Sequence, residues 1–210
     1  MLLRDDNATA YLRDVRGLSP EIIAKAQIGH NGRGFTIPIK DVRTRELVNL
    51  RIRFWPKLPL SGAKYQGLAG HTLENGGVTI YPGMPGGNAL VLCAGEFDAL
   101  VLWRHGLPGI TVTSGAATRW RKEWGWMVKG KRVAVIYDAD PREEEQALSR
   151  AAELRAAGAD AWRVRLSKGG LGNGEDITSW FTDQGRSQRE LLNLINVERH
   201  GKLRRKKVAA

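Results

Sequence analysis

Cysteine is almost absent from this chain of 210 residues, since Cys93 is the only one. A single cysteine cannot form an internal disulfide, and it excludes a structural zinc site built from several cysteines. The four histidines are scattered without metal-ligand spacing. Long hydrophobic runs are also missing, and no segment approaches membrane-spanning length. The N-terminus, Met-Leu-Leu-Arg-Asp-Asp, lacks the apolar core of a signal peptide. A cytoplasmic protein without membrane contact is therefore expected.

Acidic residues are outnumbered by basic ones. The chain has 33 Lys and Arg against 22 Asp and Glu, which gives a formal net charge of +11. A basic body with a basic tail favours a polyanionic partner, most often nucleic acid. A solubilising surface with a disordered tail would have the same charge. The tail cations, all within the last ten residues, are Lys202, Arg204, Arg205, Lys206 and Lys207.

Hydrophobic spacing predicts two regions of different architecture. The first third of the chain indicates two short helices, the second capped by Ser19, and a β-hairpin with the polar link 41–46. Residues 57–88, rich in Gly and Pro, are expected to be loop with one short strand. Over 89–166 apolar strands alternate with helices, which predicts a parallel sheet covered on both faces. A last helix is expected over 187–199. The predicted fold is thus α/β: a parallel sheet flanked by helices and preceded by a smaller α+β subdomain with a β-hairpin.

Acidic residues gather where the predicted strands end. Ligands bind beyond the carboxyl ends of the strands in such sheets. Three acidic loops in one small domain repel each other unless a cation lies among them. Mg²⁺ or Mn²⁺ is the simplest explanation, because hard cations take carboxylate oxygens. The acids are Glu96 and Asp98 after one strand, Asp138 and Asp140 after a second, and Glu175 and Asp176 after a third strand and a Gly-rich loop.

Some of these acids also have a purely structural interpretation. Loops after strands are rich in Asp for turn reasons, so the pair Asp138 and Asp140 taken alone is equally consistent with a structural role. Glu96 lies in the turn that leads into a helix. An interaction of the Glu96 carboxylate with the positive N-terminal end of that helix is therefore preferred over metal ligation.

Several motifs together resemble a Toprim domain, which DnaG-type primases share with topoisomerases and some nucleases. Weaker upstream motifs, Phe35-Thr36-Ile37-Pro38-Ile39 and Lys64-Tyr65 among them, resemble the start of the bacterial primase catalytic core. Order and spacing agree over about residues 10–180. The chain thus resembles the RNA-polymerase domain of a DnaG-like primase of plasmid or phage type, without the zinc-binding module. The Toprim motifs are Gly95-Glu96-Phe97-Asp98-Ala99-Leu100, Thr113-Ser114-Gly115 and Tyr137-Asp138-Ala139-Asp140.

The resemblance implies three parts and a set of site residues. Residues 1–86 would be the basic α+β N-terminal subdomain, 87–183 the Toprim domain, and 184–210 a C-terminal helix with a basic tail or linker. The implied side chains are Asp98, Asp138 and Asp140 for catalysis and metal binding, Asp176 for metal binding, and Arg51, Arg53 and Lys64 for template or nucleotide binding.

The activity implied by the resemblance is DNA-dependent primer synthesis, in which a nucleotide is added to a 3′-hydroxyl. Mg²⁺ or Mn²⁺ would activate that hydroxyl and neutralise the triphosphate. Single-stranded DNA and NTPs are the expected partners, with a replicative helicase, fused or separate, as a further one. Two alternatives stay open: a Toprim nuclease, and a non-catalytic DNA-binding module that recruits a helicase.

Position 94 departs from the Toprim motif, which begins with a glutamate there, whereas this chain has Ala94. A methyl group can neither bind a metal nor transfer a proton, so primer synthesis by this chain is expected to be impaired. Three explanations compete. The position carries an engineered Glu-to-Ala change, which is favoured because the neighbouring motif residues are intact. Alternatively, the chain is a natural, degenerate member that only binds nucleic acid, or Glu96 substitutes for the missing acid.

Overall fold

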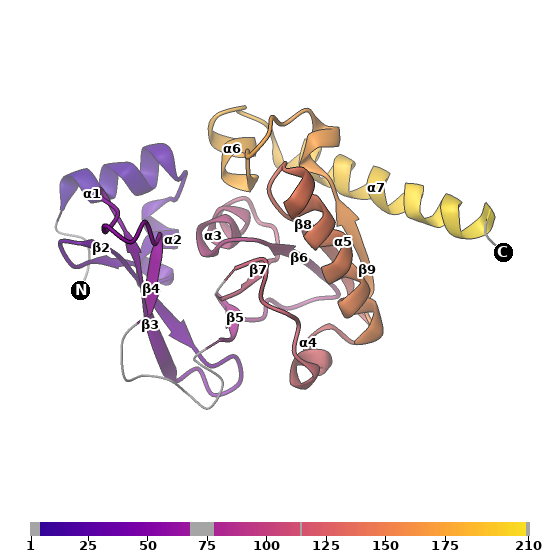
Figure 1. Cartoon of the computed structure of the whole chain (residues 1–210), viewed down its shortest axis with the longest axis horizontal. Coiled ribbons are helices and arrows are strands. Elements are labelled where there is room, and N and C mark those ends of the chain that lie inside the picture. The colour runs from indigo at the N-terminus through magenta and orange to yellow at the C-terminus, as the bar shows by residue number, and fades with distance from the viewer. Residues whose placement is uncertain (1–4, 68–77, 114, 209–210) are drawn as a thin grey trace.

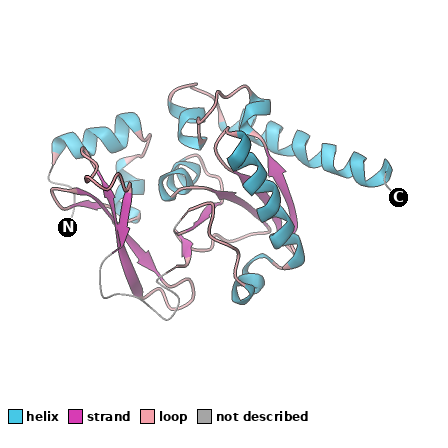
Figure 2. Ribbon diagram, viewed as in Figure 1, coloured by secondary structure: helices cyan, strands magenta, loops and turns pink. Residues whose placement is uncertain are grey.

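The computed structural model of the protein describes residues 5–67, 78–113 and 115–208, and it contains a four-stranded and a five-stranded sheet (Figure 1). Helices lie around the five-stranded sheet and beside the four-stranded one (Figure 2). This confirms the predicted α/β fold, in which a smaller sheet precedes a mostly parallel sheet in the chain. Ser114 of the Toprim-like motifs and the side chains from residue 202 onward lie outside the described part.

The four-stranded sheet contains the predicted hairpin. Its link covers residues 41–46, as expected. Two further strands of only two and three residues were not expected, because elements this short leave no periodic signal. Ser19 caps the second helix, as predicted. The helices are α1 (Asp6–Ala10), continued by the π-helical η1 (Tyr11–Val15), and α2 (Pro20–Lys25); the antiparallel strands, in sheet order, are β1 (Gly29–His30), β2 (Gly34–Lys40), β3 (Leu47–Phe54) and β4 (Tyr65–Gly67).

The hairpin turns two arginines toward the rest of the protein. Phe35, Ile37 and Ile39 alternate along β2 and are fully buried. Arg53 lies opposite Phe35, and Arg51 lies opposite Ile37. Directly opposed residues of antiparallel strands extend to the same face of a sheet. Both arginines therefore lie on the core face of the sheet rather than on its solvent face.

The five-stranded sheet is parallel except for one edge strand. In sheet order its strands are β5 (Ile80–Tyr81), β7 (Gly109–Val112), β6 (Ala89–Cys93), β8 (Arg132–Ile136) and β9 (Asp160–Val164), and β5 alone is antiparallel to its neighbour. The helical elements are α3 (Glu96–Arg104), η2 (Lys122–Trp124), α4 (Gly125–Val128), α5 (Pro141–Ala156), η3 (Leu166–Gly169), α6 (Ile177–Thr182) and α7 (Gln188–Val208).

Two details differ from the predicted boundaries. α7 ends at Val208, so the last helix runs well past the expected end at residue 199, through part of the predicted tail. β5 precedes residue 87 but pairs with β7 in the second sheet. Within the described residues, none of the helices combines the length and apolar character needed to cross a membrane.

A shared hydrophobic core joins the two sheets. It packs the buried face of β2 against α3, and it extends to β9, α6 and the first turns of α7. The rings of Phe35 and Phe97 meet edge to face at 5.9 Å between centroids, so α3 lies where the two sheets meet (Figure 1). A second core covers the opposite face of the five-stranded sheet under α4 and α5. The Toprim-like strand ends are therefore held in place by the first sheet as well as by their own helices.

Gly109→Ala is expected to destabilise the protein by about 2 kcal/mol or more. Gly109 begins β7, where α3 approaches closely. A Cβ atom there would lie 2.6 Å from the Leu102 Cβ and 2.8 Å from the Ala99 carbonyl oxygen. Urea unfolding would measure the loss of free energy. Gly86→Ala is the matched control, because a Cβ at Gly86 meets nothing within 4 Å. Equal stability of the two variants would contradict this close packing.

Candidate active site

Three of the predicted acids interact with one another at the strand ends. Asp98, near the start of α3, is 6% exposed, and Thr178 Oγ1 donates a hydrogen bond to its Oδ1 at 2.8 Å. Burial, followed by the charges of Asp176 and Asp138, raises the pKa of Asp98 to about 7, against the lowering effect of the Arg16 charge. Burial and Asp176 likewise raise the pKa of Asp138, to about 6. The directions of these shifts put the three carboxylates within electrostatic reach of one another.

Asp140 and Asp176 each cap a helix. Asp140 Oδ1 accepts hydrogen bonds from the backbone N–H groups of Arg142 at 2.8 Å and Glu143 at 3.0 Å, at the start of α5. Asp176 Oδ1 accepts one from Ser179 at 2.8 Å, at the start of α6. The structural role considered for the Asp138–Asp140 pair therefore holds for one oxygen of Asp140. A cap also orients the carboxylate, which keeps its second oxygen in a fixed direction.

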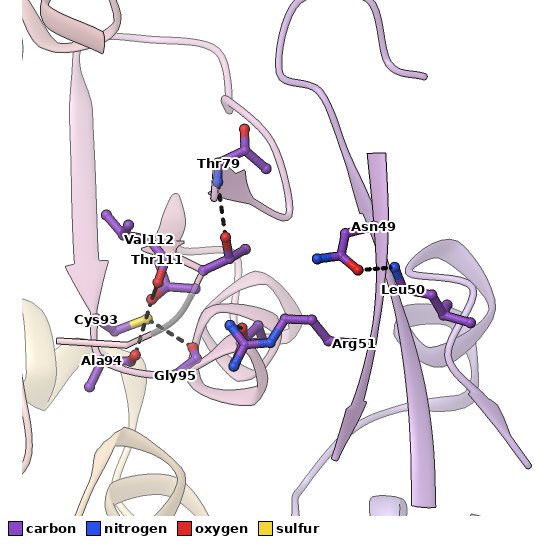
Figure 3. Close-up of polar contacts among 11 residues, drawn as sticks. Asn49, Leu50, Arg51, Thr79, Cys93, Ala94, Gly95, Thr111 and Val112 are labelled. Carbon is purple, nitrogen blue, oxygen red and sulfur yellow. Dashed lines mark hydrogen bonds and ion pairs between the residues drawn. The ribbon is translucent and has the colours of Figure 1, made fainter. Parts of the chain in front are cut away.

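Glu96 is turned away from these acids, toward the first sheet. It is the first residue of α3 and only 3% exposed, and its Oε1 lies 2.9 Å from Arg51 Nη1 of β3. Figure 3 shows Arg51 reaching from β3 toward the turn at Gly95. Burial raises the pKa of Glu96, and the Arg51 charge counteracts this effect. The carboxylate thus does more than favour the helix end, because it links the two sheets through a buried ion pair.

Cationic side chains of the N-terminal part of the chain lie near the acids. The guanidinium carbon of Arg53 lies 4.9 Å from the Phe97 ring centroid, and that of Arg16 lies 5.4 Å from the same centroid. The Arg16 charge lowers the pKa of Asp98, and the Lys64 charge lowers that of Asp138. Opposite charges therefore lie within electrostatic reach of one another at this end of the sheet.

Two of these residues were missed by sequence reasoning as members of the site. Arg16 belongs to a weak upstream motif, and its position beside Asp98 depends on how η1 packs against α3. Its Nε is buried and has no hydrogen-bond partner within the described part of the chain. Thr178 is 80 residues from Asp98. No local pattern could indicate such a long-range hydrogen bond.

Ala94 lies in the turn between β6 and α3. Its carbonyl oxygen accepts a hydrogen bond from Thr111 Oγ1 at 3.2 Å, and the Cys93 Sγ donates to the Gly95 carbonyl at 3.5 Å (Figure 3). The Ala94 side chain is half-buried beside the second core. A Cβ at Gly95 would lie 2.9 Å from Asp98 Oδ2. Position 94 is therefore one residue from a glycine whose small size leaves room for the acid.

The carboxylates fit a divalent cation as an incomplete donor set. Mg²⁺ and Mn²⁺ prefer oxygen ligands, and a cation would relieve the repulsion among Asp98, Asp138 and Asp176. However, no group of three or more His, Cys, Asp or Glu side chains within the described residues is arranged to hold a metal ion by itself. The methyl group of Ala94 contributes no further oxygen.

Known proteins match the chain in structure only. No family model matches the sequence, and neither does any curated protein. The zinc-binding and RNA polymerase domains of Aquifex aeolicus primase superpose with a TM-score of 0.70 and 19% identity, over 92% of this chain and 56% of that one. The chain therefore spans little more than half of that protein.

Two further primase structures match over most of the chain. The RNA polymerase domain of Mycobacterium tuberculosis primase DnaG gives a TM-score of 0.65 at 11% identity, over 92% of this chain and 77% of that one. The primase fragment of the bacteriophage T7 primase-helicase gives a TM-score of 0.56 at 16% identity, over 86% of this chain and 72% of that one. The arrangement of the two sheets and their helices is thus a known one. The chain has the fold of the RNA polymerase domain of DnaG-type primases.

Proposed function

We propose that this chain is the core of a DnaG-like primase, which adds nucleotides from NTPs to a 3′-hydroxyl on a single-stranded DNA template. One observation carries the proposal. Within a primase fold, Asp98, Asp138 and Asp176 lie within electrostatic reach of one another, and Arg16, Arg53 and Lys64 of the N-terminal part lie within electrostatic reach of these acids. Acids that suit a divalent cation and cations that suit phosphates then lie on opposite sides of one site.

In this proposal Asp98 and Asp138 hold Mg²⁺ or Mn²⁺, with Asp140 and Asp176 contributing the carboxylate oxygens that their helix caps leave over. The bound ion would supply charge neutralisation for the triphosphate and activation of the hydroxyl. Thr178 fixes the orientation of the Asp98 carboxylate through its hydrogen bond. Because Ala94 adds no ligand, we propose that ion binding is weak and primer synthesis impaired.

Arg53 and Lys64 would hold the template or nucleotide backbone, contacts that position a nucleic acid without reading its sequence. Arg51 differs from them. Its side chain is 12% exposed, paired with Glu96, and stacked over the Tyr65 ring at 4.7 Å. We propose that Arg51 acts on the template indirectly, by holding β3 and β4 against the start of α3.

Arg51→Met is expected to destabilise the protein by about 3 kcal/mol, because it leaves the buried Glu96 carboxylate without its partner. The double variant Arg51→Met/Glu96→Leu is expected to recover most of this loss, since both buried charges are then gone. Urea unfolding of the two variants gives the comparison. If Arg51→Met were as stable as the parent protein, the ion pair would not join the two sheets.

Three parts of the proposal concern organisation. We propose an N-terminal subdomain, a Toprim domain and a C-terminal segment, with the first boundary placed ahead of β5, since β5 belongs to the second sheet. A phage or plasmid origin is proposed from the resemblance alone. The bacteriophage T7 protein is a primase-helicase. We extend this to the present chain by proposing a replicative helicase, fused or separate, as its partner.

A single assay, run on the chain as given and on its Ala94→Glu variant, separates this function from its alternatives. Each protein is incubated with Mn²⁺, labelled NTPs and single-stranded DNA, and the products are resolved on a gel. Extension products support a primase, cleavage products a Toprim nuclease, and a band shift alone a non-catalytic DNA-binding module.

A further inference from the structure

A small cavity lies where α2, β5 and α3 meet, apart from the acidic site. Its volume is about 130 Å³. This is close to the size of cavities that hold one aromatic ring. None of Asp98, Asp138, Asp140 or Asp176 lines it. Its apolar side is formed by Ile22, Pro38, Leu100 and the Trp103 ring.

Three cations from separate elements converge on this cavity. Lys25 ends α2, Lys40 ends β2, and Arg45 lies in the link between β2 and β3. Lys40 donates to Gln27 Oε1 at 2.6 Å, and Arg45 donates to the Pro82 carbonyl at 3.4 Å. Lys25 Nζ lies 5.0 Å from the Trp103 ring centroid.

Acidic residues adjoin these cations in the sequence, since Asp41 follows Lys40 and Glu46 follows Arg45. Within the described residues, none of them forms an ion pair, whereas cations elsewhere in the protein, such as Arg51, Arg165 and Arg199, do. Three positive charges around one small cavity that form no ion pair among the described residues favour an anionic ligand, and a dianion balances them better than a monoanion.

Backbone geometry marks the same place. Gln27 has φ of 55° and Arg45 has φ of 63°, and they are the two non-glycine residues with positive φ in the described part of the chain. Both line the cavity. Non-glycine residues with a left-handed backbone conformation are often found at ligand sites, where the surrounding structure maintains the strained backbone.

Tyr81 adds a buried polar group. It lines the cavity from β5 and is 3% exposed, and its hydroxyl has no hydrogen-bond partner among the described residues. Burial and the charges of Glu96 and Tyr65, which do not line the cavity, raise the pKa of this hydroxyl, so Tyr81 connects the cavity to the contact between the two sheets.

From these observations we infer that the cavity binds a small phosphate ester that carries a ring, of which a mononucleotide is the simplest example. The phosphate lies among Lys25, Lys40 and Arg45, and the ring lies against the apolar side. Because the lining residues come from both sheets, such a ligand bridges them and stabilises the folded protein. The inference holds whether or not the chain makes primers.

The test uses the full chain in EDTA, which prevents metal-bridged binding at the acids. Calorimetry and thermal unfolding would compare 5′-AMP with its two parts, adenosine and inorganic phosphate. The expected result is that 5′-AMP binds more tightly than either part and raises the unfolding temperature. Adenosine binding as tightly as 5′-AMP, or no detectable binding of 5′-AMP or phosphate at 10 mM, would overturn the inference.

Variants then locate the site. Lys40→Met and the double variant Lys25→Met/Lys40→Met are expected to weaken 5′-AMP binding at least tenfold, without lowering the unfolding temperature of the free protein. Lys122→Met is the matched control, since Lys122 is exposed on η2 and does not line the cavity. It should bind like the parent. Unchanged affinity in the double variant, or equal loss in the control, would place binding elsewhere.

Discussion

Ala94→Glu is expected to raise Mn²⁺-dependent primer synthesis on single-stranded DNA by about a hundredfold or more. Losing one group that stabilises the transition-state charge typically costs an enzyme about 10²–10³ in rate, so restoring one should recover a similar factor. Position 94 lies in the turn before α3, whose first helical turn carries Asp98, and its half-buried side chain is next to Gly95. A glutamate there would add a carboxylate to the partial set of Asp98, Asp138 and Asp176.

The measurement is primer extension with labelled NTPs over a titration of Mn²⁺ and of Mg²⁺. Ala94→Gln is the control, because it has the size of glutamate without the charge, and it should stay near the parent activity. The glutamate variant should also reach half-maximal activity at a lower metal concentration. If it and the parent were equally inactive across templates and metals, the primase proposal would be in serious difficulty.

The contact between Glu96 and Arg51 argues against one of the three explanations of Ala94. Glu96 would have to bind metal to replace the missing acid, yet its carboxylate is buried and lies 2.9 Å from Arg51. Releasing it would leave the guanidinium without its partner in a buried place, which costs several kcal/mol. The chain as it stands therefore uses Glu96 to hold its two sheets together. An engineered change and a natural loss at position 94 both agree with this arrangement.

Hydrophobic periodicity and motifs were sufficient to predict the main strands and the fold class of this protein. The alternation of Phe35, Ile37 and Ile39 predicts β2, and the apolar runs before Gly95 and Asp138 predict β6 and β8. These are local signals, and local signals carry over into the structure. The same motifs placed Asp98, Asp138 and Asp176 near one another, because parallel strands end at one edge of a sheet.

The contacts that shape the site were beyond such signals. The family resemblance implies a template contact for Arg51, and strand register adds a contact that it could not indicate, with Glu96 on the core face of the sheet. The Thr178–Asp98 hydrogen bond and the approach of Arg16 join segments far apart in the chain. Side-chain partners of this kind depend on packing between elements, and neither residue type nor spacing specifies that packing.

Asp98→Asn should make the metal-free protein more stable above pH 7, by about 1–4 kcal/mol, even though it removes a proposed catalytic group. Burial and the charges of Asp176 and Asp138 raise the pKa of Asp98 in the folded protein to about 7. In the unfolded chain this pKa is about 3.9. The folded state thus binds the proton more tightly, and that stabilisation, full below pH 4, is lost as the pH rises through 7.

Urea unfolding in EDTA between pH 5 and 8.5 tests this. The parent should lose stability over that interval, whereas the variant should lose much less, because the amide stays neutral and can keep the Thr178 hydrogen bond. Asp183→Asn, at an exposed position, is the control and should follow the parent. Millimolar Mg²⁺ at pH 8 should stabilise the parent more than the variant, since the ion relieves the repulsion that Asp98 creates. If the unfolding free energies of the parent and of Asp98→Asn changed in parallel with pH, the Asp98 carboxylate would not be destabilised by its surroundings. The proposal that it binds a cation would then lose its electrostatic basis.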